Sequence, residues 1–372
     1  MSQYSASPTG EKFELPSPEQ YAGEFERVRA LAEAARAEGK EVVVVMGVGF
    51  VGAVMAAIIA DTVDKQTGRP SKFVIGCQRP SSRSYWKIPL LNRGQSPVKA
   101  EDPEVDPMIA RCVLEKKTLI ATYNSDCLKL ADCVVVDVQC DYTKHELGNM
   151  RSGEAEMSAL EATMRTIGER IEPPCLVLIE TTVAPGTTEF VAWPIMKKAF
   201  ATRGIHSEPL LAHSFERVMP GRHYVSSIRD FWRVCSGCNA EARRRVEKFL
   251  REVLNTEQFP LTFNDFGKDL NGLSGQWDAY TRSWVEGSPI LVATLSTNSD
   301  QVNWHYKSAQ RYGSGTMTAE YKLHDSVGHA YTLSDGMAIA SAYSSAYRKY
   351  LISGDEHNEW WWSSTGVFWD EM

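Results

Sequence analysis

The chain has 372 residues, 43% of them hydrophobic, so it is long enough for one large or two smaller domains with proper cores. Its formal net charge of −7 leaves no basic excess, which argues against an extended surface for nucleic acid or an anionic membrane. It has no run of about 18 uncharged apolar residues and no signal-peptide pattern at its start, so we expect a cytoplasmic protein with small-molecule partners.

Two segments precede the first strand-like run of the sequence. Residues 1–18 are polar and contain proline and serine, which predicts a disordered lead. Residues 19–39 place apolar groups at helical spacing and end at Gly39, which predicts an amphipathic helix. The predicted folded part of the chain therefore begins near residue 19.

Strand-like and helical patterns alternate from residue 41 to about residue 205. The predicted strands are 41–48, 72–79, 131–139 and 175–183, and the predicted helices are 50–65, 106–118, 155–171 and 188–204. Such alternation is typical of a parallel sheet that helices cover on both faces. The sequence therefore predicts an α/β fold, a Rossmann-type doubly wound parallel sheet, in an NAD(P)-binding domain over residues 19–262.

A glycine-rich motif separates the first predicted strand from its helix. It forms a G-x-G-x-x-G pattern from Gly47, Val48, Gly49, Phe50, Val51 and Gly52. The first glycine permits a tight turn, the second lets a pyrophosphate approach the backbone, and the third lets helix and strand pack closely. The alternative is an apolar turn that merely requires glycine. The flanking strand and helix, whose N-terminal amides suit phosphates, favour a dinucleotide site.

The end of the second predicted strand carries Gln78 and Arg79, where a carboxylate normally accepts the ribose hydroxyls of NAD. Gln78 can still hydrogen-bond a ribose. Arg79 can instead face a 2′-phosphate, or it can be a solvated loop residue. The sequence therefore predicts NAD as the cofactor and leaves NADP as an alternative.

Five stretches occur in a characteristic order: GVGFVG, LNRGQSPVKAEDPEV, ADCVVVDVQCDY, LVLIETTVAPGTTE and HSFERVMPGRH. Over about residues 40–262, the chain resembles the UDP-glucose/GDP-mannose dehydrogenase family of NAD-dependent nucleotide-sugar dehydrogenases. The resemblance implies oxidation of the C6 alcohol of a UDP- or GDP-sugar to a carboxylate. In that family two hydride transfers proceed through an aldehyde held on an active-site cysteine.

The resemblance also implies two catalytic residues. Thr182 matches a threonine expected near the nicotinamide and the reacting sugar carbon, where its hydroxyl can hold a water or the substrate alcohol. Glu216 matches a glutamate that faces the active site as a polar or general-base residue, with Arg217 positioning it. The alternatives are strand-end and turn chemistry at Thr182, and a surface Glu–Arg pair at Glu216.

The cysteines and histidines suggest no metal site. The eight cysteines are scattered, which predicts reduced thiols in a cytosolic protein. Cys235 and Cys238 form a C-x-x-C without a second pair or a histidine at zinc spacing. His213 is expected at the end of a strand.

The resemblance stops after residue 262. The family's central helix, which supplies a catalytic Lys and Asn and the dimer interface, has no counterpart here, so the oligomeric state stays open. Lys268 and Asp269 faintly match a later Lys-Asp loop, with Asp265 where the family's cysteine belongs, and no cysteine follows Cys238. Residues 263–372 are therefore expected to be a divergent, truncated or fused C-terminal region.

Together these features predict a homologue of the nucleotide-sugar dehydrogenases that binds a nucleotide sugar. Because the cysteine and the central helix are missing, at most a slow conversion of alcohol to aldehyde is expected, with one reduced cofactor per sugar. The alternatives are a cofactor-binding pseudoenzyme and a truncated or frameshifted product.

Overall fold

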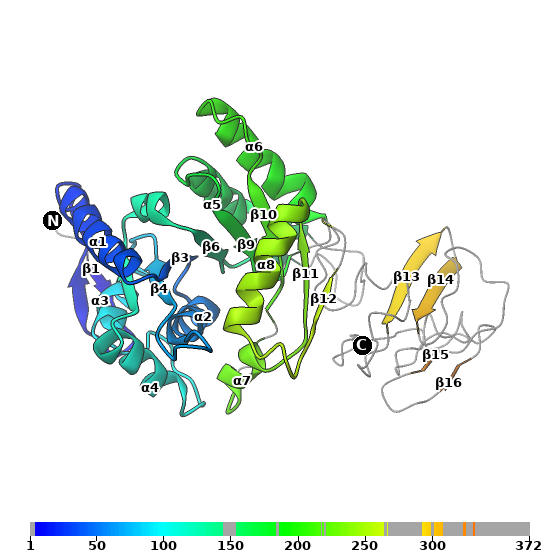
Figure 1. Ribbon diagram of the computed structural model, residues 1–372, viewed down its shortest axis with the longest axis horizontal. Helices are drawn as coiled ribbons and strands as arrows, with labels where there is room; N and C mark the ends of the chain where they lie inside the picture. The colour runs from blue at the N-terminus through cyan, green and yellow to red at the C-terminus, as the bar shows by residue number, and fades with distance from the viewer. Residues whose placement is uncertain are drawn as a thin grey trace. The chain divides into compact units, whose positions relative to one another are not determined.

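Figure 1 shows the computed structural model of the chain, which divides into two compact units, residues 1–267 and 268–372. The structure describes residues 4–143, 154–183, 186–216, 218, 221–263 and 266, with 141–143 and 154 as backbone only, and four strand backbones beyond them. Those four form antiparallel pairs, β13 (Val292–Asn298) with β14 (Gln301–Lys307) and β15 (Leu323–His324) with β16 (Ala330–Tyr331). The expectations for Asp265, Lys268 and Asp269 lie outside the described residues.

An eight-stranded sheet forms the centre of the first unit, in the order β12-β11-β10-β9-β6-β3-β4-β5. Its strands are β3 (Glu41–Met46), β4 (Lys72–Cys77), β5 (Leu119–Thr122), β6 (Cys133–Val136), β9 (Leu176–Ile179), β10 (Leu210–His213), β11 (Arg233–Gly237) and β12 (Leu261–Phe263). The pairing is parallel except between β10 and β11. Six neighbouring strands, β5-β4-β3-β6-β9-β10 across the sheet, have the Rossmann order. This order confirms the predicted fold class.

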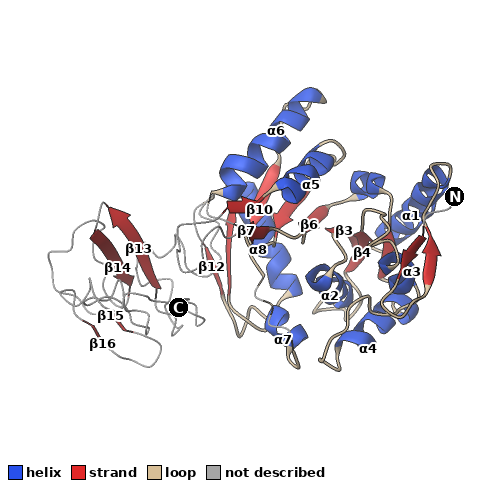
Figure 2. Cartoon of the chain, turned by 180° about the vertical axis from the view of Figure 1, so that it is seen from behind, coloured by secondary structure: helices blue, strands red, loops and turns tan. Residues whose placement is uncertain are grey.

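Helices cover both faces of this sheet (Figure 2). One face packs against α2 (Phe50–Asp61), α3 (Lys87–Asn92), α4 (Val105–Ala110), α7 (Tyr224–Arg229) and α8 (Ala240–Val253). The other packs against α1 (Gln20–Ala37), the 3-10 helix η2 (Ser125–Leu130), α5 (Ser158–Gly168) and α6 (Trp193–Thr202). Two π-helical turns, η1 (Arg111–Glu115) and η3 (Thr188–Ala192), adjoin α4 and α6. The predicted helices 106–118 and 188–204 therefore each combine an α-helix with a π-helical turn.

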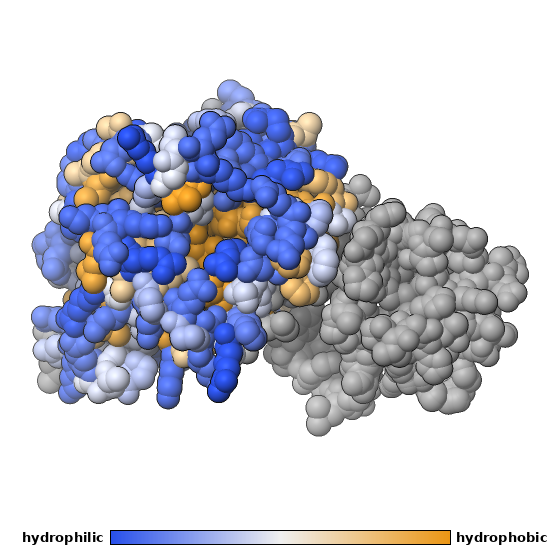
Figure 3. Space-filling view, turned by 60° about the horizontal axis from the view of Figure 1, so that its bottom comes forward, coloured by the Kyte–Doolittle hydropathy of each residue, from blue (hydrophilic) through white to orange (hydrophobic). Residues whose placement is uncertain are grey.

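The valine run of β3 explains why this strand lies in the middle of the sheet. All four residues 42–45 are fully buried, with Val43 and Val45 in one core and Val42 and Val44 in the other. Full burial of such a side chain contributes about 1.5–3 kcal/mol, so the run strongly favours a position covered on both faces. On the face of the first unit in Figure 3, hydrophilic residues predominate and apolar ones show between them near the middle.

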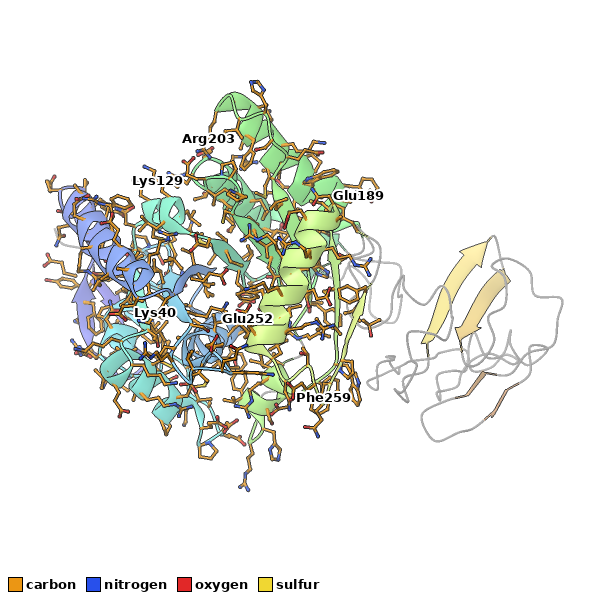
Figure 4. The ribbon with its side chains drawn as sticks, viewed as in Figure 1. Lys40, Lys129, Glu189, Arg203, Glu252 and Phe259 are labelled. Atoms are coloured by element: carbon orange, nitrogen blue, oxygen red, sulfur yellow. The ribbon has the colours of Figure 1, made fainter. Side chains whose placement is uncertain are left out.

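A buried lysine with two partly exposed carboxylate partners lies at the amino ends of the strands. Lys72, which is 1% exposed at the start of β4, lies 2.8 Å from the carboxylate of Glu41 on β3. Its ammonium also binds Glu252 on α8, which Figure 4 labels. The network therefore joins the first two strands to the last helix of the unit.

The N-terminal lead differs from its prediction, because residues 4–14 form a hairpin and not a disordered segment. Strands β1 (Tyr4–Ala6) and β2 (Lys12–Glu14) pair antiparallel. Ser5 is fully buried, and its hydroxyl accepts a hydrogen bond of 3.1 Å from the backbone N–H of Trp86. A second hairpin joins β7 (Asp141–Thr143) to β8 (Glu154–Glu156). Polar composition predicted disorder in the lead because it could not reveal this docking contact.

Candidate functional site

The glycine-rich loop lies at the carboxyl end of β3, where the strand order reverses between β3 and β6. Gly47 has a φ of +100°, and its N–H donates to the carbonyl of Cys77 over 2.8 Å. A Cβ at this position would lie 2.7 Å from the carbonyl oxygen of Asp137. Only glycine fits both the conformation and the space. Crevices at such switch points are where open α/β sheets bind ligands.

The other two glycines of the motif have different surroundings. A Cβ on Gly52 would lie 1.9 Å from the Gly47 carbonyl oxygen, so this glycine lets the first turn of α2 pack against the loop. A Cβ on Gly49 would meet only the Nζ of Lys87, 4.0 Å away. The space beside Gly49 is therefore open toward a ligand, as a pyrophosphate requires. We call the glycine-rich loop and the open space beside Gly49 the cradle. It fits the dinucleotide that the sequence predicted.

Phe50 and Val51 begin α2 directly after Gly49. Phe50 is 45% exposed, and its ring stacks on that of Tyr224 at 5.1 Å between centroids. The Tyr224 hydroxyl donates to the carbonyl of Phe50. A residue from α7 thus holds the start of α2, where the free N–H groups of the helix lie.

Gln78 contacts the loop from the end of β4. Its Oε1 accepts a hydrogen bond of 3.1 Å from the N–H of Val48, and its own N–H donates to Thr122. The amide NH2 and the second lone pair of Oε1 therefore remain as the groups that Gln78 offers to a ligand. Arg79 follows and is exposed. The structure thus brings together the motif and Gln78, with Arg79 next in the chain.

Lys87 is a residue of this site that the sequence analysis missed. It opens α3, its Nζ lies by Gly49, and partial burial lowers the pKa of its ammonium. It forms no ion pair with any residue that the structure describes. The available signal was charge, because residues 65–100 contain no Asp or Glu. An uncompensated cation at the glycine loop suits a phosphate ligand.

A carboxyl cluster (Asp137, Glu180 and Glu216) lies on the other side of the loop. Asp137 and Glu180 follow the register pair Val136 and Ile179 at the carboxyl ends of β6 and β9. Asp137 and Glu180 come two residues after Val135 and Leu178. Because alternate residues of a strand share one face, both side chains face the side covered by α2 and α8. The N–H of Glu216 donates to the Glu180 carbonyl over 3.0 Å.

Arg233 is the cation that faces this cluster, and it comes from the antiparallel strand β11. Its Nη1 lies 2.6 Å from Glu180 Oε1 and 3.3 Å from the carbonyl of Ser214. Both charged side chains are 0% exposed. Five buried atoms here have no hydrogen-bond partner in the described part of the chain: Asp137 Oδ2, Glu180 Oε2, Ser214 Oγ, and Nε and Nη2 of Arg233. The ion pair is therefore only partly satisfied.

Burial shifts the proton affinity of the cluster. Desolvation raises the pKa of Asp137 well above its ordinary value, and repulsion from Glu180 and Glu216 adds to this, while Arg233 opposes it. Burial also raises the pKa of Glu180, against the attraction of Arg233. The pKa of Glu216 is raised by burial, against the N–H that Val218 donates to its carboxylate over 2.6 Å and the charge of Arg233. These carboxyls bind protons more tightly than exposed ones.

The predicted catalytic residues follow neighbouring strands of the same edge. Glu216 comes three residues after β10, and Thr182 comes three residues after β9 and is exposed. The hydroxyl of Thr181 donates to the carbonyl of Val138 over 2.8 Å and so ties the ends of β9 and β6 together. The described structure contains no hydrogen bond between Thr182 and Glu216, and Arg217 lies outside the described residues.

The cysteines and histidines give no metal centre within the described residues. No group of three or more His, Cys, Asp or Glu side chains there is arranged to hold a metal ion. Burial raises the pKa of Cys235 to about 12 and also raises that of Cys238. Neither thiol is therefore prepared to act as a nucleophile. His213 ends β10, as predicted.

A model for the NAD-binding domain of the UDP-glucose/GDP-mannose dehydrogenase family matches residues 41–254. The chain belongs to the UDP-glucose/GDP-mannose dehydrogenase family, and the matched part is its NAD-binding domain. The expectation from the five sequence stretches is thereby confirmed.

Individual relatives match the same part of the chain. UDP-N-acetyl-D-mannosamine dehydrogenase of Pyrococcus horikoshii is 25% identical over 217 residues, which are 58% of this chain and 46% of that protein. UDP-N-acetyl-D-glucosamine 6-dehydrogenase of Pseudomonas aeruginosa is 28% identical over 142 residues, which are 38% of this chain and 31% of that protein. The chain spans about half the length of the curated relatives it matches, or less.

A solved structure agrees with this assignment. The NDP-N-acetyl-D-galactosaminuronic acid dehydrogenase from Methanosarcina mazei superposes with a TM-score of 0.53 and 27% identity, over 65% of this chain and 47% of that protein. Separately, no helix within the described residues has the length and apolar character needed to cross a membrane.

Proposed function

We propose that the chain binds a nicotinamide dinucleotide across the glycine-rich loop and oxidises the C6 alcohol of a UDP- or GDP-sugar. The observation that carries the proposal is the open cradle beside Gly49, at the strand-order reversal and within reach of the Lys87 ammonium. Membership of the family supports the choice of substrate class. The eight free cysteines support a cytoplasmic location.

The bound dinucleotide supplies the acceptor for a hydride from the sugar carbon. The loop amides and the start of α2 bind its pyrophosphate, Lys87 neutralises phosphate charge, and Gln78 contacts the adenosine ribose. These contacts fix the cofactor along the edge of the sheet that also carries the carboxyl cluster.

Thr182 and Glu216 act on the sugar in this proposal. The Thr182 hydroxyl holds the substrate alcohol or an ordered water, and the Glu216 carboxylate accepts the proton that the alcohol loses. A carboxylate whose pKa is raised by burial is a stronger base than an exposed one. The hydrogen bond from the Val218 N–H and the charge of Arg233 oppose this rise of the Glu216 pKa.

We further propose that the reaction stops at the aldehyde. A second hydride transfer in the family needs a cysteine thiolate, whereas burial holds both Cys235 and Cys238 in the thiol form. One reduced cofactor and one aldehyde per sugar is the expected stoichiometry. Two reduced cofactors and a uronic acid per sugar, measured by absorbance and mass spectrometry, would contradict it. Cofactor binding without turnover would instead favour the alternative of a binding protein.

The cofactor site is tested by replacing Gly49 with valine. The substitution meets no protein atom nearer than Lys87 Nζ at the Cβ, so the fold should persist while the side chain occupies the pyrophosphate position. Titration calorimetry should detect no binding of NAD⁺ or NADP⁺. Gly23→Val in α1, where a Cβ meets nothing within 4 Å, is the matched control and should bind normally. Unchanged affinity in Gly49→Val would sink the assignment.

A further inference from the structure

The hydrogen bond between Gln78 and Val48 determines what the end of β4 can offer a ribose. In an NAD site a carboxylate there accepts hydrogen bonds from the 2′- and 3′-hydroxyls. Here the acceptor oxygen of Gln78 is already bound to the Val48 N–H at 3.1 Å. The oxygen has one lone pair left, so Gln78 can accept from at most one hydroxyl where a carboxylate accepts from both, whereas its amide NH2 presents two donors that match the oxygens of a phosphate.

The charges around this position point the same way. Residues 65–100 contain no Asp or Glu, and several of their cations are neutralised from elsewhere. Lys65 pairs with Glu257, Lys72 with Glu41 and Glu252, and Arg93 with Glu11. The three cations that directly follow β4 form no ion pair with a described residue: Arg79, Arg83 and Lys87. Arg69 and Lys99 also form no ion pair with a described residue, so three of the five uncompensated cations in residues 65–100 lie in the segment beside the loop.

The backbone after Gln78 is held in place before any ligand binds. The Ser84 hydroxyl donates to the carbonyl of Arg79 over 2.9 Å and lies 2.8 Å from the Ser81 hydroxyl. The N–H of Tyr85 donates to the carbonyl of Ser81 over 3.0 Å. This turn fixes the Arg79 backbone one residue past Gln78, which reduces the ordering cost of binding.

We propose that the dinucleotide site selects NADP(H) over NAD(H), because Arg79 and the amide NH2 of Gln78 bind the 2′-phosphate of the adenosine ribose. The inference rests on the proposed cofactor site and adds its specificity. Lys87 is assigned to the pyrophosphate, since its Nζ lies by Gly49. Arg79, beyond the ribose contact, is left for the additional phosphate, the role an arginine has in NADP-binding Rossmann sites.

Titration calorimetry on the full chain tests this inference without turnover. We compare NADP⁺ with NAD⁺, and adenosine 2′,5′-bisphosphate with adenosine 5′-monophosphate, a pair that differs only in the 2′-phosphate. The phosphorylated member of each pair should bind on the order of 10- to 100-fold more tightly, as expected for charge-assisted hydrogen bonds. The ratio should fall as salt is added.

Three variants isolate the residues. Arg79→Ala should bring both affinity ratios close to one without weakening NAD⁺ binding. Gln78→Glu keeps an acceptor for the Val48 N–H but opposes a 2′-phosphate, so it should reverse the preference. Arg69→Ala is the matched control, an exposed arginine that precedes β4 at the other edge of the sheet, and it should leave both ratios unchanged.

The outcomes separate the inference from the function beneath it. Equal binding of the two cofactors, or tighter binding of NAD⁺, overturns the NADP preference and leaves the cofactor site intact. A preference for NADP⁺ that survives Arg79→Ala overturns the role of Arg79. Binding of neither cofactor overturns the proposed function together with this inference.

Discussion

The two sides of the glycine-rich loop differ in how they carry charge. After β4, the cations Arg79, Arg83 and Lys87 stand without carboxylate partners in the described structure. After β6, β9 and β10, three carboxyls gather around one buried arginine, and burial raises the pKa of each. Exposed charge costs the fold little and can attract a ligand of opposite sign, whereas buried charge must be paired or protonated. We call the cationic side of the loop the anion-binding side, after the proposed ligand, and the carboxyl side the proton-binding side.

Removing Arg233, the cation that faces the carboxyl cluster within the described residues, should have the largest effect. In Arg233→Met the Glu180 carboxylate loses its partner while it stays buried, so the free energy of unfolding should fall by about 3–5 kcal/mol. Urea denaturation at pH 7 measures the loss. The double variant Arg233→Met, Glu180→Gln should recover part of it, and Arg69→Met, an exposed site, should change little. A loss below about 1 kcal/mol would mean that the two sides do not differ as described.

Asp137 should make the stability of the protein depend on pH. Its pKa is raised in the folded state, so its contribution is fully present below the unfolded pKa, near 4, and is lost as pH rises through the folded pKa. Wild-type stability should therefore fall from pH 5 to pH 8. Asp137→Asn removes this titration, so its stability relative to wild type should rise by about 1–2 kcal/mol between pH 5 and pH 8. Parallel stability curves for the two proteins would contradict the prediction.

On the anion-binding side, Lys87 should affect ligand affinity and not stability. Lys87→Met removes the ammonium by Gly49 and should weaken NAD⁺ and NADP⁺ about equally, by roughly tenfold, the value of one charge-assisted contact. Because burial lowers the pKa of Lys87, wild-type affinity should begin to decline at a pH below the ordinary lysine range. Calorimetry measures both effects. Lys198→Met on α6, across the sheet, is the control.

The smallest effect is expected at Arg93, a cation within residues 65–100 that already forms an ion pair at the surface. Glu11→Gln breaks the ion pair with Arg93, in which nitrogen and oxygen lie 2.9 Å apart. The Glu11 side chain is 43% exposed and that of Arg93 is 51% exposed. The free energy of unfolding should change by less than about 1 kcal/mol, and the affinity for NADP⁺ should stay the same. A change in affinity would show that Arg93 shares the role given to Arg79.

The glycine-rich loop and the alternating strands could be predicted because their signals are local. Spacing placed Gly47, Gly49 and Gly52 after a strand, and burial on both faces follows from the valines of β3. The short strand β5 escaped notice, since four residues carry too little periodicity. The lead was predicted as disordered because the contact that docks it, between Ser5 and Trp86, is remote in sequence.

The environment of the candidate site depended on contacts that no local pattern encodes. Glu216 was singled out by its motif, yet its neighbours are remote in sequence: Asp137 follows β6, Glu180 follows β9 and Arg233 begins β11. Arg233 reaches Glu180 only because β11 runs antiparallel beside β10. Gln78 was expected to face a ribose, but its bond to Val48 needed the register of β3 and β4. Residue types were thus predictable, and their partners were not.

The network around Lys72 bears on the order in which the chain can fold during synthesis. Lys72 is 1% exposed, and one of its two carboxylate partners, Glu252, lies 180 residues later on α8. A nascent chain that has emerged only through β6 must leave this ammonium hydrated or paired with Glu41 alone. The first half of the sheet therefore reaches its final stability only when α8 has left the ribosome. The last helix thus completes the ion pairs that stabilise β3 and β4.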